Sequence, residues 1–183
     1  MSSFDERFFQ AIFQFAQKSF FLDTVGIFLA DGILYILIAL AIIFVLLQKT
    51  WRTRIFLLLE ITLACLFARG VIVEFIKFFY HKLRPFEFYG FEPLISASGH
   101  AFPSGHATTV FAIAIVIFFF NRSWGGWFLT LAIISGVARI FVGVHWPLDI
   151  LGGVIFGTGA AFLVHFLLKD QRARIWPSQN IRR

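Results

Sequence analysis

The run HWPLD, from His145 to Asp149, has the residue types and spacing of a reactive site. Pro147 suits the first turn of a helix, which leaves His145 in the turn before it and Asp149 just inside it. Asp149 can then accept a hydrogen bond from one imidazole nitrogen and leave the other free to attack an electrophile. A second histidine, His106, is a candidate proton donor to a leaving oxygen. His145, Asp149 and His106 form the predicted catalytic set.

Cations elsewhere in the chain fit a phosphate ligand. Lys77 and Arg84 are seven positions apart, so they share a helix face if that helix continues to about Leu83. Two cations on one side can neutralise two non-bridging phosphate oxygens, and arginine can bind both at once.

The segment PSGH at 103–106 opens an apolar run and adds an anion-binding feature. Ser104 and Gly105 are expected at a helix N-terminus, whose free N–H groups and dipole attract anions. Arg139 lies in another apolar run, where a guanidinium is costly unless an anion or an acid is its partner. The predicted phosphate-binding residues are Lys77, Arg84, Ser104, Gly105 and Arg139.

The composition indicates that membrane helices position these residues. Of the 183 residues, 59% are apolar and 14% are charged, and the mean hydropathy is +0.83. A soluble chain carries about 45–50% apolar and about 25% charged residues. Without a repeat or a linker, residues 1–183 are expected to form one domain.

Five apolar stretches approach the roughly 20 residues that a membrane-spanning helix needs. They are Val25–Leu47, Ile55–Phe79, Ser104–Phe120, Trp124–Val144 and Pro147–Leu168. The third is short and is expected to extend through its flanks. The predicted fold is therefore an all-α membrane protein, a bundle of about five transmembrane helices over residues 25–168.

The N-terminal segment 1–22 is predicted to be an amphipathic helix in the membrane interface. Its phenylalanines recur at helical spacing on one side, and its charged residues and glutamines lie on the other. The alternative makes this segment part of a sixth span. Three charges within its first seven residues disfavour a span that starts there.

The loop charges orient the bundle. With five spans, the segments 48–54, 121–123 and 169–183 lie on one side of the membrane and contain 9 of the 16 basic residues. An excess of Lys and Arg marks the cytoplasmic side. The tail 169–183 is thus expected inside, and the loop 81–103 and the His145 turn outside. The predicted location is the inner (plasma) membrane, with the site facing the periplasm.

Two other classes of site are disfavoured. The net charge of +6 does not indicate a nucleic-acid surface, because the basic residues sit in short blocks between apolar runs. His145 and Asp149 have spacing that suits a metal pair, but the outer loop supplies mainly Lys and Arg instead of further ligands. No metal and no cofactor are therefore expected.

Taken in order, these residues resemble the three-part signature of the type 2 phosphatidic acid phosphatase superfamily of membrane lipid phosphatases. The blocks are Lys77-x6-Arg84-Pro85, Pro103-Ser104-Gly105-His106 and Arg139-x5-His145-x3-Asp149. The resemblance implies a phosphohistidine on His145, with His106 acting as acid and then base. That third block usually begins Ser-Arg, whereas Ala138 precedes Arg139 here, which removes one hydroxyl donor.

The favoured function is hydrolysis of a lipid phosphate or diphosphate, with undecaprenyl diphosphate as the preferred substrate. Small size and an outward site resemble the bacterial members that hydrolyse this lipid. Phosphatidic acid, phosphatidylglycerophosphate and a lipid A phosphate are alternative substrates. A carrier of phosphorylated lipids is the alternative of a different class, but it has no use for a His–Asp pair with a separate acid. No protein partner is indicated.

Several polar residues belong to no motif. Glu60, Arg69 and Glu74 in the second span are interpreted as inward-facing structural pairs, and Asp31 is placed near the outer interface. The remaining histidines are interpreted as interfacial or polar-contact residues, although His100 could touch a substrate headgroup. They are His81, His100 and His165.

Overall fold

The computed structural model describes residues 3–175, whose regular elements are all helices. These are α1 (Ser3–Phe13), α2 (Phe20–Ile27), η1 (Phe28–Gly32), α3 (Ile33–Leu46), α4 (Trp51–Cys65), η2 (Leu66–Val73), α5 (Glu74–Phe79), α6 (Pro85–Tyr89), α7 (Gly105–Phe120), α8 (Arg122–Phe141), α9 (Pro147–Leu167) and α10 (Lys169–Ile175). The elements η1 and η2 are π-helical segments inside longer helices.

Four helices are long and apolar enough to cross a membrane. They are Phe20–Leu46, Trp51–Phe79, Arg122–Phe141 and Pro147–Leu167, and the apolar α7 is shorter, with 16 residues. The chain is thus an all-helical membrane protein, as predicted. The first two helices begin earlier than the expected Val25 and Ile55. The second starts at Trp51 because the Thr50 side chain accepts a hydrogen bond from the Thr53 N–H.

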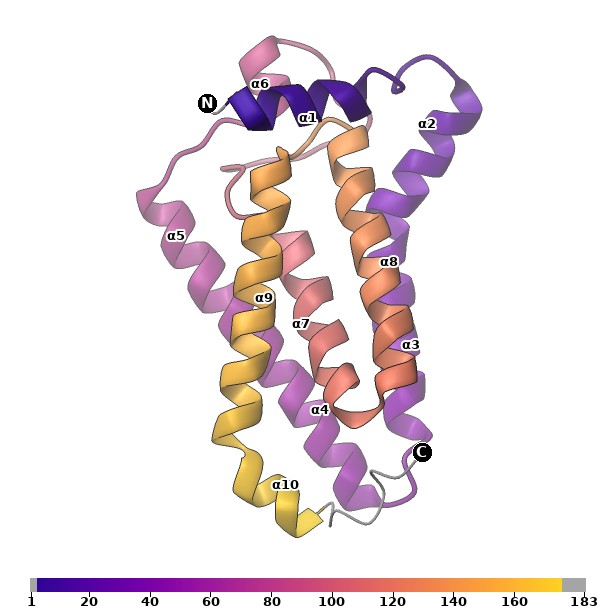
Figure 1. Cartoon of the computed structure of the whole chain (residues 1–183), viewed down its shortest axis with the longest axis vertical. Coiled ribbons are helices and arrows are strands. Elements are labelled where there is room, and N and C mark those ends of the chain that lie inside the picture. The colour runs from indigo at the N-terminus through magenta and orange to yellow at the C-terminus, as the bar shows by residue number, and fades with distance from the viewer. Residues whose placement is uncertain (1–2, 176–183) are drawn as a thin grey trace.

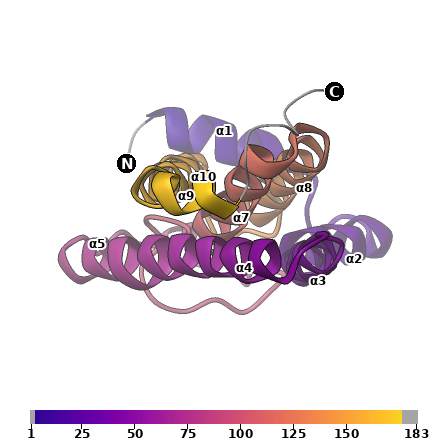
Figure 2. The same cartoon turned by 90° about the horizontal axis from the view of Figure 1, so that it is seen from below.

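The expectation that the third span extends through its flanks was wrong. Ser104 caps α7 at its start, where its side chain accepts from the Ala107 N–H. At the other end, Asn121 caps the following helix through the Trp124 N–H. A short α7 is tolerated because it lies in the middle of the bundle, between α4, α8 and α9, with most of its residues buried (Figures 1 and 2).

Small residues on α9 bring this helix close to α7. A Cβ at Gly157 would lie 2.3 Å from the Thr108 carbonyl oxygen, and one at Gly153 would lie 2.7 Å from the Cβ of Ala107. Close approach of backbones through small residues is a common packing mode of membrane helices. The contact brings the starts of α7 and α9 together, and the Ser104 N–H donates to the Asp149 carbonyl at 3.0 Å.

The N-terminal helix α1 lies across one end of the bundle, over α8 and α9 (Figure 1). It ends at Phe13, well before the predicted end of the interfacial segment at residue 22. Gln17 then turns the chain with a positive φ of 59°, and its N–H donates to the Asp23 side chain of α2.

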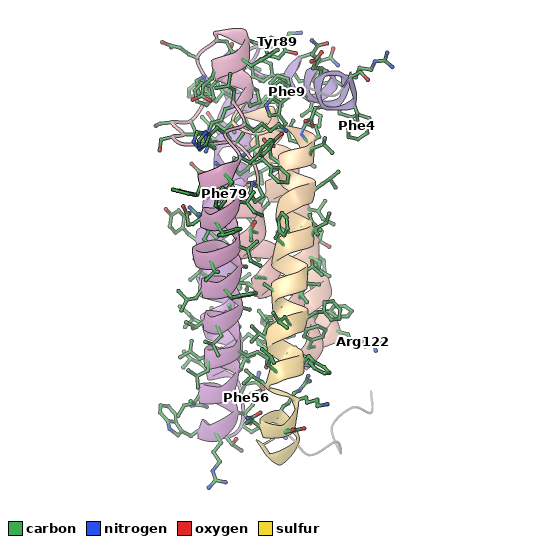
Figure 3. The ribbon with its side chains drawn as sticks, turned by 90° about the vertical axis from the view of Figure 1, so that its left-hand side faces the viewer. Phe4, Phe9, Phe56, Phe79, Tyr89 and Arg122 are labelled. Carbon is green, nitrogen blue, oxygen red and sulfur yellow. The ribbon has the colours of Figure 1, made fainter. Side chains whose placement is uncertain are left out.

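The opposite end of the bundle carries α10 and the α3–α4 and α7–α8 connections (Figure 1). Phe56 and Arg122 mark this end in Figure 3, and Phe9 and Tyr89 mark the other. The segments predicted to lie together on the cytoplasmic side therefore gather at one end. Of the predicted basic tail, residues 176–183, with Arg182 and Arg183, lie outside the described residues.

Candidate active site

His145 lies in the buried turn between α8 and α9, and two charged side chains flank its imidazole. Its Nδ1 is 3.6 Å from Oδ2 of Asp149, and its Nε2 is 3.5 Å from Nη1 of Arg84. The carboxylate and the guanidinium thus lie next to different nitrogens of one ring. This arrangement can hold Nδ1 toward Asp149 while Nε2 faces an anion bound by Arg84.

The Asp149 carboxylate lies in the first turn of α9 and forms a capping box with Trp146, the N-cap residue. Its Oδ2 accepts from the Trp146 N–H at 2.9 Å, so the residue beside His145 Nδ1 also fixes the start of α9. Pro147 occupies the first helical turn, as its fixed φ favours. The local sequence HWPLD therefore determines the turn that was predicted.

The Arg84 side chain forms hydrogen bonds to two loops next to His145. Its Nε and Nη2 donate to the carbonyls of Gly99 and Ser98 at 2.8 and 2.9 Å, and its Nη1 donates to the Val144 carbonyl at 3.0 Å. A guanidinium has five N–H donors. Nη1 also lies 3.5 Å from His145 Nε2, so within the described part of the chain one N–H, on Nη2, remains for a ligand. Burial, and then the nearby Arg139, lower the pKa of Arg84.

The N-terminus of α7 contributes His106 beside these cations. The His106 Nδ1 is 3.4 Å from Nη1 of Arg139, and its Nε2 is buried without a hydrogen-bond partner among residues 3–175. A buried, unpaired ring nitrogen is costly in the absence of a ligand. Ser104 and Gly105, which precede it, are buried at the first turn of the same helix.

Arg139 has the acid partner that its apolar surroundings require. Its Nη1 donates to Oδ1 of Asp31 at 2.6 Å, which links α8 to η1. Asp31 was predicted only to lie near the interface, and its pairing with Arg139 was missed. The Nε of Arg139 is buried and unpaired within the described residues, so the guanidinium keeps a donor for a ligand.

The expectation that Lys77 and Arg84 share a helix face was wrong. Helix α5 ends at Phe79, and the chain is extended from Tyr80 to Arg84. Tertiary hydrogen bonds hold this extended segment: the Lys82 carbonyl accepts from the Ala101 N–H, and the Leu83 carbonyl accepts from Trp146 Nε1. The Lys77 ammonium is nevertheless near enough to Arg84 for the two charges to interact.

Arg69 is a further cation at this end of the bundle. It lies against the start of α7, since a Cβ added to Gly105 would be 2.5 Å from the Arg69 Nε. It forms an ion pair with Glu74, as predicted, but the two side chains are 45% and 58% exposed and do not face inward. The third residue of that group, Glu60, is fully buried and pairs with His165 near the opposite end.

Two further residues of this cluster, Lys82 and Asp5, were not predicted from the sequence. The Lys82 ammonium donates to Asp149 Oδ1 at 2.8 Å and to Asp5 Oδ2 at 2.9 Å. Burial alone would lower the pKa of Lys82, but these two carboxylates outweigh it and raise the pKa above its ordinary value. Lys82 sits inside the first signature block, which was a usable signal. Asp5 had none.

Three residues singled out in the sequence form no polar contact with His145, His106 or the cations in the contacts described above: Ala138, His100 and His81. Ala138 packs with Ala30, Val142 and Val144, an apolar setting for the position where a serine is usual. His100 stacks on His81 with ring centroids 4.2 Å apart. Within residues 3–175, no three His, Cys, Asp or Glu side chains form a group that could hold a metal ion. Metal independence stays a prediction.

The fold and the site define a class: a multi-pass helical membrane protein with two histidines, an orienting carboxylate and several cations at one end. The PAP2 superfamily matches residues 57–173. The chain belongs to this superfamily of membrane lipid phosphatases.

Relatives support this assignment. YbjG of Escherichia coli is 34% identical over 73% of this chain and 67% of its own length. An undecaprenyl-diphosphatase of Sulfolobus acidocaldarius is 30% identical over 70% of this chain and 62% of its own length. The crystal structure of Aquifex aeolicus LpxE has a TM-score of 0.72 at 24% identity, covering 89% of this chain and 95% of LpxE, and shows the fold alone. The chain spans about two thirds of the length of these two sequence relatives.

Proposed function

We propose that this protein removes the terminal phosphate of a polyprenyl diphosphate, with undecaprenyl diphosphate as the favoured substrate. The observation that carries the proposal is the position of His145 between Asp149 at 3.6 Å and Arg84 at 3.5 Å. A neutral imidazole held in this way presents one nitrogen to a phosphorus atom bound by cations.

In the first step, His145 Nε2 attacks the terminal phosphorus, and the bond from that phosphorus to the bridging oxygen breaks. His106 donates a proton to the bridging oxygen, which leaves as the polyprenyl monophosphate. Asp149 stabilises the positive charge that develops on the imidazole. Lys77, Arg84, Arg139 and the N-terminus of α7, with Ser104 and Gly105, hold the phosphate oxygens.

In the second step, His106 accepts a proton from water, and the water oxygen attacks the phosphorus of the phosphohistidine. The nitrogen–phosphorus bond breaks, inorganic phosphate leaves, and His145 is again neutral. The reaction needs no redox partner, and the cations supply the charge stabilisation that a metal ion supplies in other phosphatases.

Two observations favour a diphosphate over a monoester. The described site holds Lys77, Arg84 and Arg139, with Arg69 beside Gly105, which is more positive charge than one phosphate group requires. A relative named as an undecaprenyl-diphosphatase is 30% identical to this chain. Relatives named for lipid A and for phosphatidylglycerophosphate are 35% and 31% identical, so these lipids are the competing substrates.

The proposal includes a topology. Five helices, α7 among them, cross the membrane, and α1 lies in the outer interface over the site. The ends of the bundle differ in charge as the positive-inside rule requires for an outward-facing site. Cysteines at the exposed Ser96 and Ser123, in a Cys65→Ala background, should label from opposite sides of spheroplasts, with Ser96 outside. Labelling of both from one side would contradict this topology.

The substrate test compares kcat/KM for undecaprenyl diphosphate, farnesyl diphosphate and phosphatidic acid in the same detergent micelles. We expect the two diphosphates to be turned over faster than phosphatidic acid. Faster release of phosphate from phosphatidic acid would reject undecaprenyl diphosphate as the favoured substrate. Binding without phosphate release from any of the three would favour the carrier over the enzyme.

A further inference from the structure

The N-terminal helix α1 contacts the catalytic turn with two side chains one helical turn apart. Asp5 and Phe9 lie on the same face of α1, as residues four apart do. Oδ1 of Asp5 accepts from the Leu148 N–H at 2.8 Å, and the Phe9 ring lies 5.1 Å from that of Trp146. Both contacts therefore fall on residues 146–148, between His145 and Asp149.

A buried chain of charges continues from Asp5 to the residue that orients His145. The ammonium of Lys82 bridges Asp5 Oδ2 and Asp149 Oδ1, and the exposed fractions of the three side chains are 9%, 2% and 0%. A buried ion pair of this kind depends on every member, because loss of one partner leaves an uncompensated charge. Three segments far apart in the sequence thus meet at the Lys82 ammonium.

This bridge fixes how Asp149 faces His145. One carboxylate oxygen, Oδ1, is held by Lys82, and the other, Oδ2, is held by the Trp146 N–H and lies 3.6 Å from His145 Nδ1. Without Lys82, Oδ1 loses its charged partner, and only the contacts of Oδ2 hold the carboxylate in its orientation. Without Asp5, the ammonium loses the partner that holds it in place.

The aromatic contacts of α1 act on the same turn. Phe9 is 1% exposed and lies among the rings of Trp146, Tyr89, Phe91 and Phe13. Figure 3 shows Phe9 with Tyr89 at the site end of the bundle, and Phe4 toward the outside. The neighbouring Phe8 is 52% exposed. One face of α1 thus packs on the catalytic turn, and the other carries exposed phenylalanines.

We propose that Asp5 and Lys82 are positioning residues, and that α1 clamps the catalytic turn so that Asp149 stays oriented toward His145. The inference rests on the proposed roles of His145 and Asp149. It adds that the N-terminal helix is required for catalysis even though it supplies no group to the substrate. The loss caused by opening the clamp therefore falls on kcat instead of KM.

The test uses full-length protein in detergent with matched pairs of variants. Asp5→Asn is compared with Glu6→Gln, Lys82→Met with Lys18→Met, and Phe9→Ala with Phe8→Ala. Lys18 and Phe8 are exposed, and Glu6 is more exposed than the buried Asp5. We expect the first member of each pair to lower kcat by about 10-fold to 100-fold, the size of the loss when groups that orient metal-bound histidines are removed. The control variants should keep the wild-type kcat, and KM should change little in all six.

Two measurements separate positioning from mere stability. Lys82→Met removes a positive charge near Asp149 and His145, so the acidic limb of kcat/KM should move to higher pH, and Lys82→Arg should restore much of the activity. The charge-balanced double variant Asp5→Asn/Lys82→Met should lose much less than the product of the two single losses, because both act through one carboxylate. Its melting temperature also shows whether it folds.

The clamp is rejected if the two members of each matched pair have the same kcat. It is also rejected if the loss of kcat in the double variant equals the product of the single losses. A third contrary result is a lower melting temperature of Lys82→Met with an unchanged acidic limb of kcat/KM. His145→Ala and the three lipid substrates are measured beside these variants. A change in substrate ranking or an active His145→Ala would overturn the proposed function. The ratios between matched variants test the clamp on whichever lipid phosphate is hydrolysed.

Discussion

The Nε2 of His145 lies 3.5 Å from Nη1 of Arg84, on the other side of the ring from the Asp149 carboxylate. Arg84 is held by three backbone carbonyls, so its guanidinium is fixed before any ligand arrives. A preorganised cation beside a nucleophile stabilises the charge of a phosphoryl transition state without reorganisation. The geometry leads to predictions that separate the role of each group.

His145→Ala should abolish turnover, because it removes the proposed nucleophile. A phosphoenzyme trapped from the wild-type protein should be labile in acid and stable in alkali, as phosphoramidates are. His106→Ala should form it poorly or fail to hydrolyse it. His81→Ala, which changes an exposed histidine with no proposed role, serves as the control for general effects. Full activity of His145→Ala would exclude the mechanism.

The pH dependence of kcat/KM should show an unusually low acidic limb. Burial lowers the pKa of His145 to about 4, a shift that the nearby Asp149 carboxylate opposes and that Arg139 and Arg84 reinforce. In the proposed mechanism the neutral imidazole attacks, so a lowered pKa keeps the enzyme active as the pH falls. Activity should persist from neutral pH to about pH 5, below the ordinary histidine value of about 6.5.

The ionisation of the substrate must be separated from that of the enzyme. Phosphorus NMR of the lipid in the same micelles gives the substrate's own titration, and the rates are corrected for it. An acidic limb that stays near pH 6.5 after this correction would show that His145 is less buried in solution than in the structure.

Metal removal should leave the activity intact. Cations already lie where a metal would act, and the described residues hold no group of three metal-ligating side chains. Turnover should be unchanged in EDTA, and vanadate should inhibit by mimicking five-coordinate phosphorus. Loss of activity in EDTA that a divalent ion restores would reverse this assignment.

The parts of the site that were predictable from the sequence depend on local signals. Pro147 and Asp149 define the turn and the helix start within a few residues, and Ser104 caps α7 in the same way. The charges of the loops predicted which connections lie at the same end of the bundle. The lengths of the apolar stretches predicted the long helices. Each of these predictions depends on the residues of one short segment of the chain.

The parts that were missed depend on residues far apart in the sequence. Arg139 and Asp31 are separated by 108 positions, and Lys82 and Asp5 by 77. The end of the second helix at Phe79 has no proline or glycine to mark it. Distant partners hold the extended segment instead, among them Ala101 and Trp146. Periodicity cannot reveal contacts of this kind.

The ion pair of Arg139 with Asp31 should stabilise the fold. Arg139 is 8% exposed and would be left without this acid partner in Asp31→Ala. Breaking a fully buried pair costs about 3–5 kcal/mol, and the half-exposed Asp31 reduces this toward about 1 kcal/mol. The melting temperature in detergent should fall, whereas Asp23→Ala at the exposed start of the same helix should have a smaller effect. Equal melting temperatures would show that the pair contributes no stability.

Arg69 should distinguish diphosphates from monoesters. It lies against Gly105 at the start of α7 and is partly exposed, and Glu74 is its ion-pair partner. In the proposed site, Lys77, Arg84 and Arg139 hold the reacting phosphate, so the second phosphate of a diphosphate needs a further cation. Arg69→Gln should therefore lower kcat/KM for farnesyl diphosphate by about tenfold, the loss of one charge-assisted hydrogen bond of about 1.5 kcal/mol.

The same substitution should change kcat/KM for phosphatidic acid little, and Arg122→Gln at the opposite end of the bundle is the control for net charge. Glu74→Gln should have the reverse effect, because it frees the Arg69 guanidinium for the diphosphate. Equal losses on both substrates in Arg69→Gln would place Arg69 with the residues that hold the reacting phosphate. No loss on either substrate would make the Arg69–Glu74 pair a structural contact of η2 and α5.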